Sequence, residues 1–379
     1  MFPKENSSNG YHNPPPPPPG VGNINSHRER ARRGTRRSRA SRDSISLRVY
    51  DQQQQQQQRA PCTDFDMAYF HSYAHLGIHE EMIKDRVRTE TYREAIMRHQ
   101  SFIAGKVVVD VGCGTGILAI FCAQAGAKRV YAVDASDIAL QDVEINEQSM
   151  LGSVITARDR WLKPGGLILP SNATLYMAPV THCDRYSGSI DFWRNVYGID
   201  MSAMLSLAKQ CAFEEPSVET ITGENILTWP HVVKYIDCYS VTIGELETVT
   251  TRFKFNSMMR APLHGFAFWF DVEFNGPAMP QSNYPSSTSF TDNHLVNGSQ
   301  RKKRINPNEA LVLSTAPEDP PTHWQQTLIY FYDPIELEQD QVIEGLVTLT
   351  QSKENARFMN IHLEYTSGGR SHIKESVMR

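Results

Sequence analysis

The sequence predicts an α/β unit with a shortened doubly wound sheet, followed by a larger, mainly antiparallel β domain. Three observations predict this order. A strand, a glycine-rich loop, a helix and a second strand follow one another over 107–133. Alternating apolar segments follow Pro170, and low-complexity composition precedes residue 63. We therefore expect a tail over 1–62, a first domain over 63–170 and a second over 171–379.

The first 62 residues are predicted to be disordered. They hold the proline run Pro14–Pro19, the arginine-rich stretch Arg28–Arg42 and the glutamine run Gln52–Gln58, and such composition cannot form a packed core. The arginine stretch fits a nuclear-import signal, a nucleic-acid contact or a methylation target, and it fits a solvated charge run equally well. With a second basic cluster, Arg301–Arg304, it predicts a distribution between nucleus and cytoplasm.

Charge is divided unevenly along the chain. Residues 1–62 carry 11 basic and 4 acidic side chains, so the whole-chain charge of −4 leaves −11 on the remainder. An acidic body suits a cationic partner, and nucleic acid would be bound only through the basic arm. No apolar run approaches the roughly 18 residues of a membrane span. We therefore expect no membrane association. The six cysteines lack a Cys-x-x-Cys pair, so we also expect reduced thiols and no metal site.

The α/β unit is predicted from Val107–Val111 and Val130–Val133, two strands that flank a helix over Gly116–Ala125. Its loop runs DVGCGTG over 110–116. Glycines let a backbone turn tightly and approach a ligand at the positive end of a helix. The third glycine comes one residue earlier than in the dehydrogenase pattern, which favours S-adenosylmethionine over a dinucleotide. Asp134, at the end of the second strand, is placed to bind the ribose hydroxyls.

The second domain is predicted from seven alternating segments: Leu175–Ala178, Val232–Asp237, Phe266–Phe274, Ala310–Leu313, Thr327–Tyr332, Glu344–Thr350 and Asn360–Tyr365. Two stretches interrupt them. Residues 186–209 are helical with an aromatic set, which fits either core packing or a dimerisation arm, and 275–307 reads as a disordered surface insertion.

Three motifs carry a resemblance to a known family. They are YFHSYAHLGIHEEMIKDRVRTETY over 69–92, Thr322-His323-Trp324, and FWRNVYGIDM over 192–201. From about Asp66 to the C-terminus the chain resembles the protein arginine methyltransferases, and within them it looks most like the plant group numbered six, a type I group. The resemblance implies an S-adenosylmethionine-binding Rossmann-like domain, a β-barrel-like domain with a helical dimerisation arm over 186–209, and a homodimer.

The resemblance also implies the cofactor site. Phe70 and Tyr73 would cover S-adenosylmethionine as an aromatic lid, and Arg88 would pair with its carboxylate. The remaining cofactor residues it implies are His79, Asp110, Gly112, Gly114, Gly116 and Asp134.

For the substrate, the resemblance implies that Tyr69, Met82 and Trp324 border the arginine, and that Tyr73, Asp85 and His323 belong to the catalytic site. Met82 would restrict which methylated product fits, although ordinary core packing also explains a methionine there. His323 could equally be a structural surface histidine. The implied substrates are Arg/Gly-rich basic proteins such as histones or RNA-binding proteins, and the implied products are mono- and asymmetric dimethylarginine.

One segment of the family pattern is missing. The family localises the lone pair of the arginine guanidinium with two glutamates on a hairpin, and the chain carries no such hairpin. Near 138–150 the sequence is internally shortened, and only Glu144 and Glu147 stand as weak substitutes. There is no room for the further strands of a doubly wound sheet, since a βαβ unit takes about 30 residues.

Two hypotheses about function therefore stay open. The first is an S-adenosylmethionine-dependent, type I arginine methyltransferase. The second is a catalytically inactive homologue or splice form that dimerises through 186–209 and regulates a partner. Restoring the missing hairpin would distinguish the two, because it would rescue activity only in the first.

Overall fold

The computed structural model describes residues 73, 75–134, 150–277, 310–355 and 357–379, all within one compact unit, 61–379. The predicted tail, Tyr69, Phe70, Glu144, Glu147 and most of the predicted insertion lie outside the described residues. Within the described part, no helix is long and apolar enough to cross a membrane.

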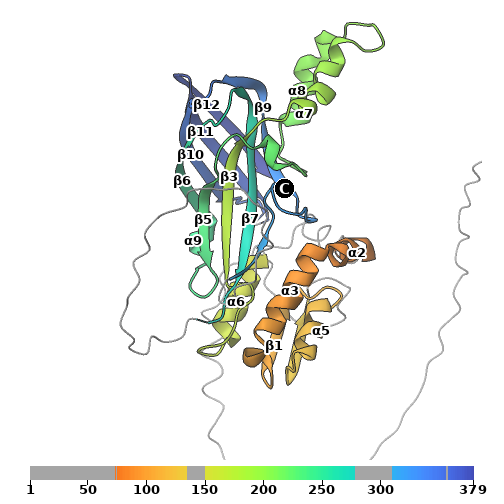
Figure 1. Cartoon of the computed structure of the whole chain (residues 1–379), viewed down its shortest axis with the longest axis vertical. Helices are drawn as coiled ribbons and strands as arrows, with labels where there is room; N and C mark the ends of the chain where they lie inside the picture. The colour runs from red at the N-terminus through yellow and green to blue at the C-terminus, as the bar shows by residue number, and fades with distance from the viewer. Residues whose placement is uncertain (1–72, 74, 135–149, 278–309, 356) are drawn as a thin grey trace, which may run out of the picture. The chain divides into compact units, whose positions relative to one another are not determined.

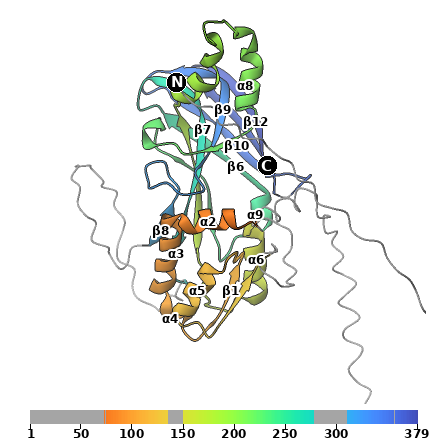
Figure 2. The same cartoon turned by 90° about the vertical axis from the view of Figure 1, so that its right-hand side faces the viewer.

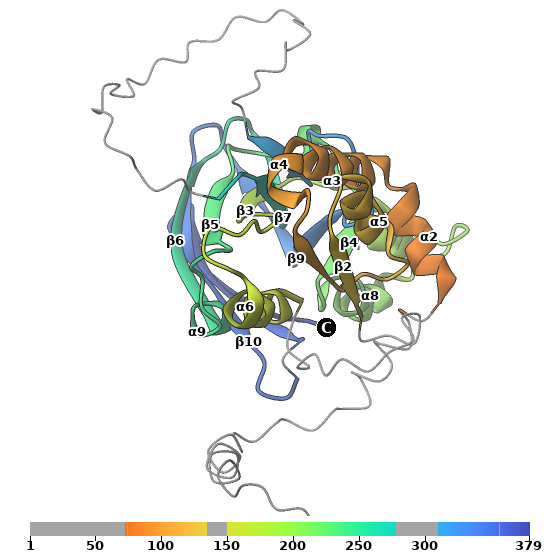
Figure 3. The same cartoon turned by 90° about the horizontal axis from the view of Figure 1, so that it is seen from below.

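The first elements are helices α2 (Leu76–Lys84), α3 (Arg86–Arg98) and α4 (Gln100–Ile103), followed by β1 (Val107–Val111), α5 (Ile117–Gln124), β2 (Arg129–Val133) and α6 (Met150–Trp161). β1 and β2 pair in parallel, with Val107 opposite Arg129 and Val111 opposite Val133. Helices α5 and α6 both lie against β1 (Figure 3). The predicted βαβ unit is confirmed.

Strands of a parallel sheet are usually buried on both faces, but β1 and β2 are partly exposed. Val107 is 59% exposed, Val109 38% and Tyr131 49%. The opposite face packs, through Val108 and Val130, on a small core that α5 completes. Only two strands of the doubly wound sheet occur among the described residues, and no other described strand pairs with either of them. The described part of the α/β unit is therefore a two-stranded sheet, as short as the sequence predicts.

The second part is built from antiparallel strands. One sheet has the order β4–β9–β7–β3–β5, with β8 paired to β7, and the other has the order β12–β11–β10–β6. The strands are β3 (Asn172–Val180), β4 (Ser217–Glu219), β5 (His231–Asp237), β6 (Thr248–Asn256), β7 (Ala261–Phe274), β8 (Leu311–Ser314), β9 (Gln326–Leu337), β10 (Val342–Gln351), β11 (Met359–Ser367) and β12 (Arg370–Met378). The remaining short helices are η3 (Gly223–Asn225) and α9 (Gly244–Glu247).

The two sheets share one aromatic core. The rings of Phe331 and Tyr365 stack at 4.9 Å across it, and Phe253 meets Phe266 at 5.5 Å. The fold class expected from the sequence, an α/β unit followed by a β domain, is confirmed. The described strands form two packed sheets that are not hydrogen-bonded into a closed barrel, because β5 and β6 lie next to each other without pairing.

The helical excursion is broken rather than continuous. It consists of α7 (Cys183–Ser189), η1 (Asp191–Arg194), η2 (Ser202–Met204) and α8 (Leu205–Phe213), and it lies beyond one end of the strands (Figures 1 and 2). Tyr197 and Gly198 both have positive φ, at 54° and 86°, so the chain turns there. Tyr186 anchors the base in a buried cluster, whereas Tyr197 at the tip is 98% exposed. The helical interruption expected over 186–209 is present, but the turn at Tyr197–Gly198 divides it between η1 and η2.

Candidate functional site

The glycine loop between β1 and α5 needs its glycines. Gly112, Gly114 and Gly116 have φ values of 74°, 49° and 79°, a region that other residues rarely adopt. The amide of Gly114 donates to Oδ2 of Asp134 at 2.7 Å, so the strand-end acid predicted for the ribose also fixes the loop. A Cβ on Gly114 would lie 2.7 Å from the imidazole of His79. The loop therefore turns as tightly as the sequence predicts.

His79 connects the first helix to this loop. It is buried on α2, and its Nε2 lies 2.7 Å from the carbonyl oxygen of Tyr73. The Tyr73 ring meets it edge-on at 6.4 Å. The structure thus brings together Tyr73, His79, Gly114 and Asp134, four of the predicted cofactor residues.

Arg88 and Asp110 carry polar atoms without a partner among the described residues. Nε and Nη1 of Arg88 are buried and make no hydrogen bond, and the same holds for Oδ2 of Asp110. Burial raises the pKa of Asp110, against the opposing effects of the Ala119 backbone amide and the Arg88 charge. Unsatisfied buried polar groups are costly and are rare in folded proteins. An amino-acid group, with a carboxylate for Arg88 and an ammonium for Asp110, would satisfy both, so these residues fit S-adenosylmethionine.

Asp85 and His323 form a buried pair between α3 and the loop that precedes β9. Asp85 caps α3 by accepting from the Arg88 amide at 2.9 Å. Its other oxygen accepts from the His323 amide at 2.9 Å and from Nδ1 at 2.7 Å. Burial alone would raise the pKa of Asp85, but these hydrogen bonds together outweigh it and hold the pKa below its usual value. The carboxylate therefore stays ionised and fixes the His323 ring.

Trp324 and Met82 were predicted to border the substrate. The structure places Trp324 against His323, Phe270 and the guanidinium of Arg88. Met82 lies half-buried on α2, and its carbonyl accepts from the Thr89 hydroxyl at 3.1 Å. Contact of either side chain with a substrate stays a prediction.

Tyr92 is a site residue that the sequence reasoning missed. Its ring centroid lies 5.5 Å from the Arg88 guanidinium carbon. The signal was available, because positions four apart on a helix lie on one face. No role was assigned to Tyr92 from the sequence, although it ends the 69–92 motif.

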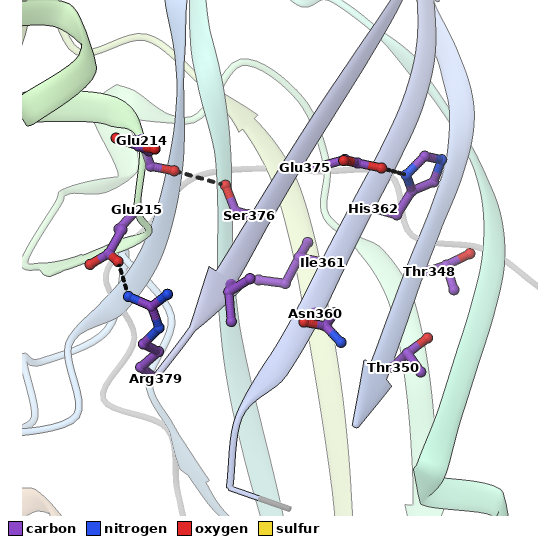
Figure 4. Close-up of a pocket in the computed structure, with 11 residues that line it drawn as sticks. Glu214, Glu215, Thr348, Thr350, Asn360, Ile361, His362, Glu375, Ser376 and Arg379 are labelled. Atoms are coloured by element: carbon purple, nitrogen blue, oxygen red, sulfur yellow. Dashed lines mark hydrogen bonds and ion pairs between the residues drawn. The ribbon is translucent and has the colours of Figure 1, made fainter. Parts of the chain in front are cut away.

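A separate pocket of about 420 Å³ lies between the end of α8 and the outer face of β10–β12 (Figure 4). Its acidic lining includes Glu214, Glu215 and Glu375, and Glu375 pairs with His362. No predicted site residue lines it. No cluster of three metal-ligating side chains occurs in the described part of the chain.

Two family models match this chain. The arginine methyltransferase oligomerisation subdomain matches residues 171–294 and 302–370, and the ribosomal protein L11 methyltransferase matches 94–151. A probable protein arginine N-methyltransferase 6 of Arabidopsis thaliana is 65% identical over 401 residues, covering 93% of this chain and 92% of its own length. Protein arginine N-methyltransferase 6 of Danio rerio is 38% identical, covering 80% of this chain and 90% of its own length.

Solved structures of arginine methyltransferases resemble this chain in fold. A Trypanosoma brucei PRMT1 enzyme–prozyme heterotetrameric complex with AdoHcy superposes with a TM-score of 0.65 at 26% identity, covering 81% of this chain and all of that chain. Arabidopsis thaliana protein arginine methyltransferase 10 gives a TM-score of 0.63 at 26% identity, covering 82% of this chain and all of that one.

The glycine loop, the strand-end acid and the attached β domain define an S-adenosylmethionine-dependent methyltransferase. The chain belongs to the protein arginine methyltransferase family. The expected likeness to the plant group numbered six is confirmed.

The alignment with the Arabidopsis relative includes positions that face no residue of this chain. The alignment with the Arabidopsis relative spans 401 positions, whereas 93% of the 379-residue chain is about 352 residues. About 49 positions of the alignment therefore face no residue of this chain. The internal shortening near 138–150 stays a prediction.

Proposed function

We propose that this chain is a type I protein arginine methyltransferase that forms mono- and asymmetric dimethylarginine. The observation that carries the proposal is the pair of buried guanidinium nitrogens of Arg88, Nε and Nη1, that have no partner among the described residues and lie near Asp110, the residue that opens the glycine loop. A buried guanidinium without a partner favours a bound carboxylate, and bidentate pairing would satisfy it. The cofactor supplies an electrophilic methyl group when it is bound.

The chain's own residues would hold that cofactor from two sides. Arg88 would take the carboxylate, and the loop from Gly112 to Gly116 would receive the nucleoside end. Asp134 would bind the ribose hydroxyls while it fixes the loop through Gly114. The cofactor thus rests on residues from α3, β1 and the end of β2.

The arginine side of the site would use Asp85 and His323. Arginine is a poor nucleophile because its charge is delocalised and its pKa lies above roughly 12. A desolvated, negatively charged environment is what the reaction needs. Asp85 provides one such charge, since its hydrogen bonds lower its pKa. The family's double-glutamate hairpin is absent from the sequence. Asp85 would therefore supply a larger share of the negative charge near the substrate arginine.

The proposed substrates are Arg/Gly-rich basic proteins such as histones or RNA-binding proteins. The net charge of −11 on residues 63–379 supports a cationic substrate. The relatives' names support arginine as the acceptor, and the type I assignment rests on the resemblance to the plant group.

The proposed assembly is a homodimer formed through residues 186–209, which run from α7 into α8. The oligomerisation model spans these helices. At the tip of the excursion Phe192 and Ile199 are exposed, as an interface would require. Sedimentation of the full chain, compared with a Phe192→Glu variant, tests this: a dimer that the variant dissociates is expected, and a monomeric parent chain would refute it.

The proposed location is nucleus and cytoplasm, based on Arg28–Arg42 and Arg301–Arg304. A fluorescent fusion of the full chain tests it. Exclusion from the nucleus would refute the proposal, and so would an unchanged distribution after both clusters are replaced by glutamine.

Methylation is tested in two steps on the full chain. Calorimetric titration with S-adenosylhomocysteine should give saturable binding that Arg88→Gln weakens about a hundredfold. Mass spectrometry of an Arg/Gly-rich peptide should then show mono- and asymmetric dimethylarginine. Binding without methylation, restored when the Arabidopsis relative's extra segment is inserted, would identify this form as the inactive homologue instead.

A further inference from the structure

The Arg88 guanidinium lies against two aromatic rings from different parts of the fold. Its central carbon is 5.5 Å from the ring centroid of Tyr92 and 5.9 Å from that of Trp324. Both distances are within the roughly 6 Å at which a ring face attracts a cation. Tyr92 comes from α3 itself, whereas Trp324 comes from the loop between β8 and β9. A residue of the β domain therefore reaches the proposed cofactor side of the site.

The Trp324 ring is held in place on two sides. The Phe270 ring meets it edge-on at 5.4 Å, and the His323 ring lies 4.1 Å from it. His323 is in turn fixed by two hydrogen bonds to Asp85, the residue that caps α3 at the Arg88 amide. The backbone of Arg88 and the ring over its guanidinium are thus tied to the same carboxylate.

This arrangement gives the guanidinium two ring faces but leaves two of its nitrogens without a hydrogen-bond acceptor among the described residues. Nε and Nη1 are buried and unpaired among the described residues. Aromatic faces attract a guanidinium but do not occupy its N–H groups, so those groups stay available to a ligand. The rings restrict where the guanidinium can point, which reduces the entropy that a ligand's carboxylate must overcome.

We propose that Trp324 is a positioning residue for the cofactor: it orients the Arg88 guanidinium toward the carboxylate of S-adenosylmethionine. The inference rests on the proposed cofactor and adds a role for the β domain in binding it. Trp324 acts through Arg88 and through the carboxylate alone. Ligands that share the adenosine but lack the carboxylate are therefore unaffected by its loss.

The test uses the full chain and two ligands. S-adenosylhomocysteine carries the carboxylate, whereas 5′-methylthioadenosine keeps the adenosine and thioether and lacks it. Calorimetry should show Trp324→Leu weakening S-adenosylhomocysteine binding about tenfold, within the range of a partly desolvated cation–π contact. 5′-Methylthioadenosine should bind both proteins within twofold. Trp324→Phe, which keeps a ring face, should stay within about threefold of the parent chain for both ligands.

Two further variants separate positioning from packing. Phe270→Leu removes a ring that supports Trp324. It should lower the melting temperature while changing S-adenosylhomocysteine affinity less than Trp324→Leu, because the Trp324 ring remains near the Arg88 guanidinium. In an Arg88→Gln background, Trp324→Leu should cause no additional loss.

The outcomes are distinguishable. If the parent chain binds neither ligand, the proposed function fails. If the parent chain binds but Trp324→Leu weakens both ligands equally, the residue is structural and the inference is overturned. An unchanged S-adenosylhomocysteine affinity in Trp324→Leu overturns it as well.

Discussion

Replacing Asp85 by alanine should destabilise the fold by about 4 kcal/mol. The side chain is 4% exposed and accepts three hydrogen bonds: from the Arg88 amide at 2.9 Å and from His323 at 2.9 and 2.7 Å. Loss of a helix cap costs about 1 kcal/mol, and each hydrogen bond to a buried charge contributes about 1.5 kcal/mol. Because three donors lose their acceptor together, the effect should exceed that of an ordinary surface change.

Asp85→Asn is the matched variant. It keeps one acceptor oxygen for the cap but presents an amide to His323, so it should recover about 1 kcal/mol of the loss. Asp191→Ala, which removes an exposed carboxylate of a surface ion pair, should change stability by less than about 0.5 kcal/mol. Urea unfolding followed by circular dichroism measures all three. A loss below about 1 kcal/mol for Asp85→Ala would refute the assignment, as would an asparagine variant no more stable than the alanine variant.

The effect should depend on pH. The folded pKa of Asp85 is lowered from its unfolded value of about 3.9. A lowered carboxyl pKa contributes stability that is present above the unfolded value and is lost as pH falls through the folded one. The stability difference between the parent chain and Asp85→Ala should be constant between pH 6 and 8 and should narrow below about pH 4. A difference that is unchanged at pH 3 would contradict this.

Three further changes have defined outcomes. Gly114→Ala should weaken S-adenosylhomocysteine binding at least tenfold, because its Cβ would lie 2.7 Å from a buried imidazole at a φ of 49°; Gly77→Ala, with open space around it, is the control and should bind normally. Lys374→Met removes a buried hydrogen bond to the carbonyl that ends α8 and a ring contact at 4.4 Å, and should cost about 1–3 kcal/mol in urea unfolding; a cost below about 0.5 kcal/mol would contradict it. His362 has a pKa raised chiefly by hydrogen bonding to Glu364, so its contribution is present below its unfolded value near 6.5 and is lost as pH rises through the folded value. The melting-temperature difference between the parent chain and His362→Gln should therefore be larger at pH 5.5 than at pH 8.5, and equal differences would refute it.

Prediction from sequence succeeded where the requirement is local. The glycine loop was predicted because backbone with positive φ demands glycine, and Gly112, Gly114 and Gly116 all have it. The seven predicted β segments each fall within or overlap a strand, since a buried apolar face imposes alternation.

The missed strands show where this reasoning ends. β12 places Lys374 and Ser376 on its buried side, where they bind the last carbonyls of α8. The inward side chains of β12 are polar at these positions, because they contact the end of α8 and not the aromatic core. β6 does alternate, with Phe253 and Phe255 inward, but charged and threonine residues between them weaken the signal.

The amino-acid sequence determined the nucleotide loop, the order of the two parts and the family, because each depends on residues that are near one another in the chain. Only the tertiary structure placed Trp324 over Arg88 and joined His323 to Asp85. These contacts join segments far apart in the sequence and are made when α3 packs against β7 and β8. No local pattern encodes them, since they depend on how two separately predictable parts meet.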